Sequence, residues 1–339
     1  MTAQGITTVE KSLQKVLEKL ESARKMQDDW MKNGLNFVDL YVDNAGGDWL
    51  EKWGKAEEDL EFDKIRSVSV ESVKIAIDFP DFQKTQLLEI ALNHPDYTDY
   101  FSDRLSGSLT GQNVKYQRQA LLGAAIFGAV FTDYLYRKYP NLERNAISTL
   151  KARLANKKKI REFALDLNLN EVSLCGTKGK EIDKSEYNKF LSETFQAVFC
   201  AIYLECDRDF DIAGNWLIQR FIEKAVSQNV SQKSDLIESV QVSPKSAVKR
   251  RGLLGADILE AIAIDYLYHR FPEKNASQLT DWKNMLVAKE IFPKEFKAKL
   301  GSHYLELGSN FSRTRDWLVD NFIKTAVDEL VEETENQLN

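Results

Sequence analysis

The chain has 339 residues, of which 43% are hydrophobic and 29% charged, and its formal net charge is -6. This length exceeds one ordinary small domain and fits two domains with an additional segment. No apolar run approaches the ~20 residues of a membrane span, and the acidic balance counts against a general nucleic-acid binder, which needs concentrated cations for phosphate contacts. A local basic patch is still compatible with that balance.

The cysteines and the start of the chain bear on the compartment. Cys175, Cys200 and Cys206 are odd in number and lack metal-ligand spacing. The first residues show no basic stretch followed by an apolar one. We therefore expect a cytoplasmic protein, or one in an organelle stroma or matrix if a transit peptide has been removed.

Residues 1–82 are expected to form an N-terminal helical region. Within residues 8–31, apolar side chains recur at helical spacing with charged side chains between them, which is typical of an amphipathic helix. Such a helix packs either on its own domain or on a protein partner, and the sequence leaves both open.

Residues 83–232 hold a helical domain whose middle helices are apolar on several faces. The pattern predicts a long helix over 117–139, a helical region over 146–168 and a second long helix over 187–206. A further helix over 216–230 closes the unit. Helices as apolar as the two long ones belong at the centre of a domain.

The next part of the chain repeats this domain in shortened form. LLGAAI at 121–126 returns as LLGADI at 253–258, an offset of 132 residues, and the YLE at 203–205 returns at 304–306, an offset of 101. The difference means that 31 residues are missing from the middle of the second copy. We predict four segments: an N-terminal helical region (1–82), a first domain (83–232), a shortened second domain (233–330) and a polar tail (331–339).

Three motifs of the first copy resemble the ribonuclease III catalytic domain. LLEIALNH at 87–94 is similar to the family's opening L-x-x-A-L-x-H, and QRQALLGAAI at 117–126 occupies its E-R-L-E-F-L-G-D-A-V signature. ETFQAVFCAIYLE at 193–205 matches its later helix, D-A-F-E-A-x-x-G-A-I-Y-L-D. The resemblance spans about 85–225 and, more weakly, 245–328. It implies an all-α fold of two ribonuclease III-like domains with an N-terminal helical appendage, forming an intrachain pseudo-dimer or a homodimer.

The resemblance also implies where catalytic carboxylates should lie. The family's hydrolysis needs divalent metal held by acidic side chains from two helices. The corresponding positions here are Ala120, Ala124, Glu193 and Gln196 in the first copy and Gly252, Ala256, Lys294 and Lys297 in the second. Asp257, one residue along, is rotated by about 100° around the helix and cannot substitute. We therefore expect no catalytic residues, no metal and no cofactor, so that the chain is a pseudoenzyme and not an enzyme.

Basic residues are concentrated in two stretches of this acidic chain. The expected RNA-binding residues are Arg137, Lys138, Lys151, Arg153, Lys157, Lys158, Lys159, Arg161, Lys249, Arg250 and Arg251. Polyvalent basic surfaces suit a phosphate backbone, although a solvated helix face has the same composition. The resemblance favours RNA, because the family's groove is shaped for an A-form helix.

Two functions of different classes follow. The first is a non-catalytic protein that binds structured RNA or a ribonucleoprotein in RNA processing, splicing or ribosome assembly, similar to relatives in plastid splicing and organellar ribosomes. The second is a protein scaffold or assembly factor that contacts protein through residues 8–31 and its acidic surface. The basic stretches favour the first, and the net negative charge favours the second.

Overall fold

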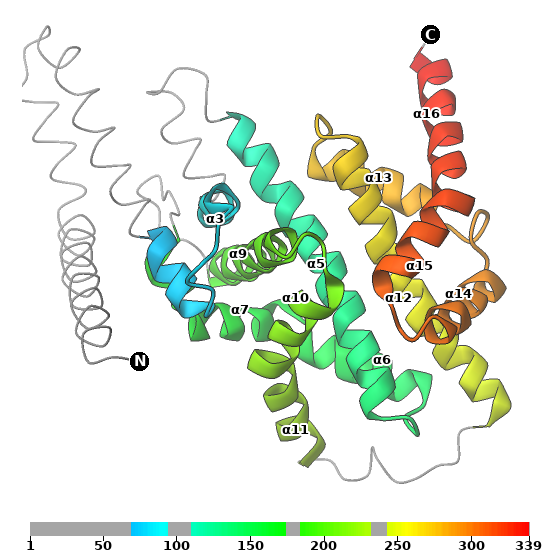
Figure 1. Ribbon diagram of the computed structural model, residues 1–339, viewed down its shortest axis with the longest axis horizontal. Helices are drawn as coiled ribbons and strands as arrows, with labels where there is room; N and C mark the ends of the chain where they lie inside the picture. Colours follow the sequence, from blue (N-terminus) through cyan, green and yellow to red (C-terminus); the bar gives the residue numbers. More distant parts are fainter. Residues whose placement is uncertain (1–68, 94–109, 174–183, 232–242, 339) are drawn as a thin grey trace, which may run out of the picture. The chain divides into compact units, whose positions relative to one another are not determined.

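The computed structural model describes residues 69–93, 110–173, 184–231 and 243–338 (Figure 1). These residues form helices and turns without a strand element among them, which confirms the all-α prediction. The amphipathic helix expected at 8–31 lies outside the described residues. The described residues fall into two compact units that meet in sequence at Thr85 and Gln86, and the larger unit contains both copies of the repeat.

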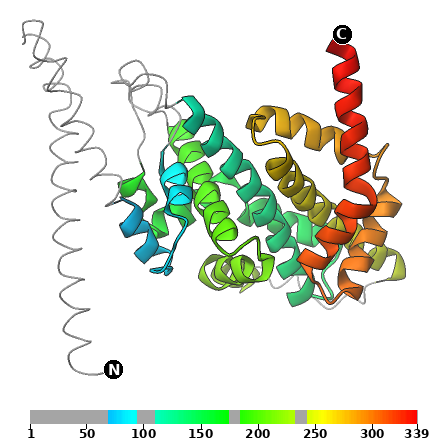
Figure 2. The same cartoon turned by 45° about the horizontal axis from the view of Figure 1, so that its top comes forward.

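The first copy consists of the described residues between 86 and 231. Its helices are α3 (Thr85–Leu92), α5 (Thr110–Lys138), α6 (Arg144–Leu154), α7 (Lys157–Asp166), α8 (Leu169–Val172), α9 (Lys184–Glu205), α10 (Phe210–Leu217), the π-helical turn η1 (Ile218–Ile222) and α11 (Glu223–Ser231). Helices α5 and α9 pack on each other at its centre (Figure 2). Leu122, Ile126 and Phe199 are buried on these helices. The two long helices that are apolar on several faces are therefore the central ones, as predicted.

The second copy, residues 243–338, begins with the counterpart of α5 and keeps the order of the first copy from there, with α7 and α8 omitted. Its helices are α12 (Pro244–Arg270), α13 (Ala276–Leu286), α14 (Lys294–Glu306), α15 (Phe311–Leu318), the π-helical turn η3 (Val319–Ile323) and α16 (Lys324–Leu338). Helices α12 and α14 form its central pair, as α5 and α9 do in the first copy. Across this continuously described segment, nothing corresponds to α7 and α8.

Side-chain caps fix where several helices begin. Ser243 accepts a hydrogen bond from the backbone N–H of Ser246, and Pro244 stands at the first position of α12. Asn156 likewise caps α7 by accepting from the N–H of Lys159 at 3.0 Å. The single helical region predicted at 146–168 is therefore split into α6 and α7, because this cap starts a new helix.

Both copies bring their central helices into backbone contact at a glycine. A Cβ atom on Gly123 would lie 1.9 Å from the carbonyl oxygen of Gln196, and one on Gly255 would lie 1.9 Å from that of Lys297. Real Cβ atoms do not approach so closely, so each crossing requires glycine. The turns η1 and η3 also occupy corresponding positions, which indicates one shared fold.

Helix α7 covers an aromatic cluster that the second copy leaves partly open. The ring of Phe163 lies 5.7 Å from Phe195 and 4.9 Å from Phe221. The corresponding rings of the second copy, Phe296 and Phe322, keep their mutual contact at 5.1 Å. Without an α7, Phe322 is 36% exposed, whereas Phe221 is 3% exposed.

One helix of the described residues is long and apolar enough to cross a membrane by length and composition. It is the Val114–Lys138 part of α5, and 72% of its most apolar window is buried inside the protein. The expectation from the sequence was that no apolar run approaches the length of a membrane span, and charged residues do interrupt this helix at Lys115, Arg118 and Asp133. Its burial is that of a central core helix.

Candidate nucleic-acid interface

The two copies pack against each other within the chain. Helices α5 and α12 are in contact, and so are α10 and α15. The rings of Phe210 and Phe311, which occupy corresponding positions, stack with centroids 4.2 Å apart and planes 8° from parallel. Contact between equivalent residues is the arrangement of an isologous, two-fold interface.

A buried arginine of the first copy binds the end of the long helix of the second. The guanidinium of Arg118 donates to the carbonyl oxygens of Tyr268 at 2.6 Å and Phe271 at 2.8 Å, and also to that of Lys274. It lies 4.8 Å from the centroid of the Tyr268 ring. Burial lowers the pKa of Arg118. The positive charge lies at the C-terminal end of α12, where a helix leaves its last carbonyl groups without intrahelical partners.

Arg250 makes the reciprocal contact from the second copy. Its guanidinium donates to the carbonyl oxygens of Tyr136 and Tyr139, both at 3.2 Å, and to that of Pro140. It lies 4.5 Å from the centroid of the Tyr136 ring and is 5% exposed. The structure thus places this expected RNA-binding residue inside the contact between the copies.

A carboxylate beside the repeated LLGA motif of the second copy also joins the copies. Asp257 on α12 accepts from the ammonium of Lys151 on α6 at 2.7 Å and from the hydroxyl of Thr132 on α5. Lys151 was expected to bind RNA, but in this structure its charge is paired. Asp257 acts in the packing of the two copies.

Two corresponding aspartates near this contact have different partners. Asp265 is fully buried and accepts from Arg208 of the first copy, with Nε 3.2 Å from Oδ1. The residue corresponding to Arg208 is Ser309, and among the described residues the ion-pair partner of Asp133 is Arg137 of its own helix, at 2.5 Å. Burial raises the pKa of Asp133 to about 6, while Arg137 acts in the opposite direction.

The raised pKa of Asp133 predicts a pH-dependent cost to stability. A folded-state value of about 6 exceeds the unfolded value of 3.8, so the folded state binds more protons between these values. This contribution to stability therefore falls as pH rises from about 4 to about 6. The free energy of unfolding of Asp133→Asn is to be compared with that of the unmodified chain at each pH. The difference should favour the variant by about 1 kcal/mol more at pH 7.5 than at pH 5.

Urea unfolding at the two pH values measures this difference. Asp265→Asn is the matched control, because that change breaks a buried ion pair and should destabilise by about 3–5 kcal/mol. A stability difference for Asp133→Asn that is the same at both pH values would show that Asp133 does not titrate in this range.

The remaining predicted cations differ in exposure. Lys138, Arg153, Lys157, Lys158 and Lys249 are exposed, whereas Arg161 and Arg251 are half-buried. Lys159 is engaged locally, with its ammonium 2.7 Å from Glu162 and 5.7 Å from the centroid of the Phe163 ring. The exposed cations are the candidates for contact with an anionic ligand, and two of them, Lys157 and Lys158, are neighbours at the start of α7.

In the first copy, the catalytic positions implied by the resemblance lie on the central helices. Ala120 is buried and Ala124 half-buried on α5, and Glu193 and Gln196 are half-buried on α9. A carboxylate oxygen of Glu193 lies 3.9 Å from the ammonium of Lys189. These positions supply one carboxylate, too few for a magnesium site of the usual kind.

In the second copy, the corresponding positions do not fit a divalent cation. Gly252 and Ala256 lie on α12, and Lys294 and Lys297 on α14. The ammonium of Lys297 donates to the carbonyl oxygen of Val287 at 2.9 Å, and burial lowers its pKa. Among the described residues, no group of three or more His, Cys, Asp or Glu side chains is placed to hold a metal ion.

Residues 84–225 match a protein-family model described as ribonuclease-III-like. Proteins named "Ribonuclease 3" are similar: that of Dehalococcoides mccartyi strain 195 is 30% identical over 166 residues, 47% of this chain and 66% of the relative. That of Chlorobium luteolum is 29% identical over 161 residues, 46% of this chain and 55% of the relative. That of Bdellovibrio bacteriovorus is 24% identical over 144 residues, 42% of this chain and 57% of the relative. The chain thus spans between about half and two thirds of these relatives.

These matches support the ribonuclease III family for the first copy and link it to RNA. They contradict the expectation that the chain is not an enzyme, because the relatives that it matches are named as ribonucleases. That expectation inferred inactivity from residue identities at positions assigned by motif resemblance, and the comparisons give it no support.

Proposed function

We propose that this chain binds structured RNA in RNA processing, with its two copies acting as an intrachain pair. The reciprocal packing of two corresponding helical copies carries this proposal. Because Arg118 and Arg250 each hold the long helix of the other copy, one chain supplies both halves of a ribonuclease-III-like pair. A duplex would lie across surface contributed by both.

The start of α7 is the part of the first copy best suited to RNA phosphates. Lys157 and Lys158 occupy its first turn and are exposed. Cations at a helix N-terminus stand at the unfavourable end of the helix macrodipole. An anion bound there interacts favourably with both the lysines and the free N–H groups. The two lysines at this helix end therefore destabilise the free protein slightly, and they favour the binding of an anionic ligand.

Replacing these two lysines tests the proposal. Lys157→Glu/Lys158→Glu should weaken binding to a short RNA duplex at least ~10-fold near 0.1 M salt and lower the slope of log affinity against log salt by about two. Gel-shift titrations with EDTA present read binding without turnover. Lys289→Glu/Lys299→Glu, which changes exposed lysines of the second copy by the same charge, is the matched control. Equal affinities for the two double variants would contradict the assignment of α7.

A protein scaffold is the second candidate, favoured by the uncovered aromatic face of the second copy. Met285 is 51% exposed, Ile291 39% and Phe322 36%. A partner helix with an aromatic side chain in the place that Phe163 takes in the first copy would cover this face. Purification from the host with and without nuclease treatment separates the candidates. A protein that is retained after nuclease and lost with Phe322→Ser supports the scaffold.

A further inference from the structure

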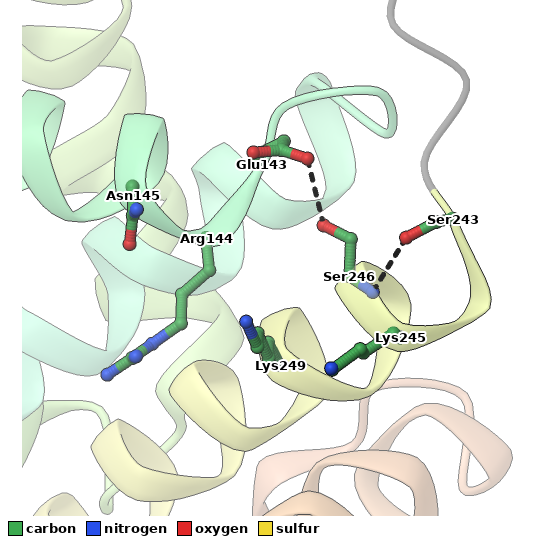
Figure 3. A pocket seen from close by; sticks show the side chains of 7 residues that line it. All are labelled: Glu143, Arg144, Asn145, Ser243, Lys245, Ser246 and Lys249. Atoms are coloured by element: carbon green, nitrogen blue, oxygen red, sulfur yellow. Dashed lines mark hydrogen bonds between the residues drawn. The ribbon is translucent and has the colours of Figure 1, made fainter.

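A hollow of about 180 Å³ lies where the start of α6 meets the start of α12 (Figure 3). Arg144 contributes from the first copy, and Lys245 and Lys249 contribute from the second. Figure 3 shows Lys245 and Lys249 on α12 and Arg144 on α6 beside them, with its guanidinium pointing away from the two ammonium groups; Glu143, Ser243 and Ser246 form the upper edge of the hollow in this view. The hollow is thus assembled from both copies.

The charges of the hollow favour an anion. Lys245 and Lys249 stand one helical turn apart on α12, where like charges repel each other. Within the described parts of the chain, neither of them nor Arg144 is in an ion pair. Glu143 is the one acidic lining residue, which leaves an excess of two positive charges. Three cations have therefore been brought together without a counter-charge of equal size.

The rim and the helix start reinforce this preference. The hydroxyl of Ser246 donates to the carboxylate of Glu143 at 3.4 Å, so this acid is turned toward the rim. Neither α6 nor α12 has an acidic residue in its first turn. The positive end of the 27-residue helix α12 therefore adds to the field of the lysines.

At the other end of the pair, the three positions that correspond to the cations of the hollow are not basic. The residues that correspond to Arg144, Lys245 and Lys249 are Ala276, Asn113 and Gln117, which are all uncharged. If the cations served only the packing of the copies, their charge would be expected at both ends. These three positions are therefore basic at one end only.

We propose that this hollow binds one phosphate group of an RNA ligand, an inference that rests on the proposed function for the identity of the ligand. Its volume is below the roughly 300–1,000 Å³ typical of sites for drug-sized molecules, so a single phosphate suits it better than a whole cofactor. Arg144 supplies the planar fork that pairs with phosphate oxygens, and the lysines supply point charges. The phosphate is either a terminal monoester or an internal diester of the strand.

Two arms of one titration distinguish these sources. Lys245→Gln/Lys249→Gln is titrated with duplex RNA carrying a 5′-phosphate and with the same duplex carrying a 5′-hydroxyl. We expect a loss of at least ~10-fold against the unmodified chain, with a smaller salt slope. A loss confined to the phosphorylated duplex identifies the terminal monoester, and an equal loss with both identifies an internal diester. Unchanged affinity for both duplexes overturns the proposal.

Inorganic phosphate separates a failure of this site from a failure of the proposed function. Phosphate should raise the thermal unfolding midpoint of the unmodified chain, as any ligand of the folded state does. The rise in the midpoint caused by phosphate should be smaller for Lys245→Gln/Lys249→Gln than for the control Lys289→Gln/Lys299→Gln, which has the same net charge. If this difference appears while no variant binds RNA, the site stands as a phosphate site and the RNA function fails. If RNA binds but the two double variants behave alike in both assays, the site is refuted and the function stands.

Discussion

Gly255→Ala is expected to destabilise the second copy by at least about 3 kcal/mol, at the upper end of overpacking effects. The new methyl carbon would lie 1.9 Å from the carbonyl oxygen of Lys297 and close to the backbone of Gly301. Both obstacles are backbone atoms of α14, so no side-chain rotation can relieve the overlap. The helices α12 and α14 must separate, and the core that they share loses contacts.

Gly252→Ala is the matched control for that change. Gly252 lies on the same helix, and the nearest atom to an added Cβ is the methyl carbon of Ala298 at 3.9 Å, an ordinary contact. Alanine there should raise stability by about 0.5–1 kcal/mol, because glycine is the poorer helix former. Urea unfolding of both variants measures the difference. Equal stabilities would refute the backbone contact between α12 and α14.

Arg250→Ala is expected to lower the free energy of unfolding by about 3 kcal/mol or more, since a buried donor to several carbonyl oxygens is lost. The oxygens of Tyr136, Tyr139 and Pro140 would then face the contact between the copies without this partner. Arg250→Lys should recover less than half of the loss, because an ammonium lacks the fork that reaches separate acceptors. Arg118→Ala should have a similar effect.

Arg251 provides the comparison for Arg250. It is the next residue on α12 and is half-buried, and no hydrogen bond of its side chain joins the copies within the described part of the chain. Arg251→Ala should stay within about 0.5 kcal/mol of the unmodified chain, as surface changes usually do. Chemical unfolding of these four arginine variants measures the differences in stability. A loss for Arg250→Ala as small as that for Arg251→Ala would show that the reciprocal contacts do not hold the pair.

The contact between the copies also controls the proposed phosphate site. Arg144 and Lys249 come from different copies and line one hollow only while α6 and α12 remain side by side. Asp257 and Lys151 fix the same two elements to each other. A change that loosens the pair should therefore weaken phosphate binding even when no cation of the hollow is altered.

Much of the fold could be predicted because its signals are local. The apolar faces of 117–139 and 187–206 identified the central helices, and the repeated LLGA motif identified the second copy. The glycine of that motif is needed at both crossings. The extra break between α6 and α7 was missed, although Asn156 is a favourable N-cap residue and could have indicated it.

The contacts between the copies could not be predicted, because they depend on residues more than a hundred positions apart. Composition and spacing placed Lys151 and Arg250 among exposed cations, whereas the structure pairs one with Asp257 and buries the other against carbonyl oxygens. One signal was available: Arg118 and Arg250 recur at the same position of the duplicated signature. No spacing rule links Arg144 to Lys249.

The stoichiometry of the RNA complex tests the central claim, that one chain is a complete pair, most directly. Sedimentation velocity of the unmodified chain with a short RNA duplex, in EDTA and near 0.1 M salt, measures the mass of the complex. The intrachain pair predicts one chain for each duplex, with the free protein remaining a single chain. Two chains on each duplex would contradict the claim of an intrachain pair. The absence of any complex, at protein concentrations at which basic proteins bind RNA, would also contradict it.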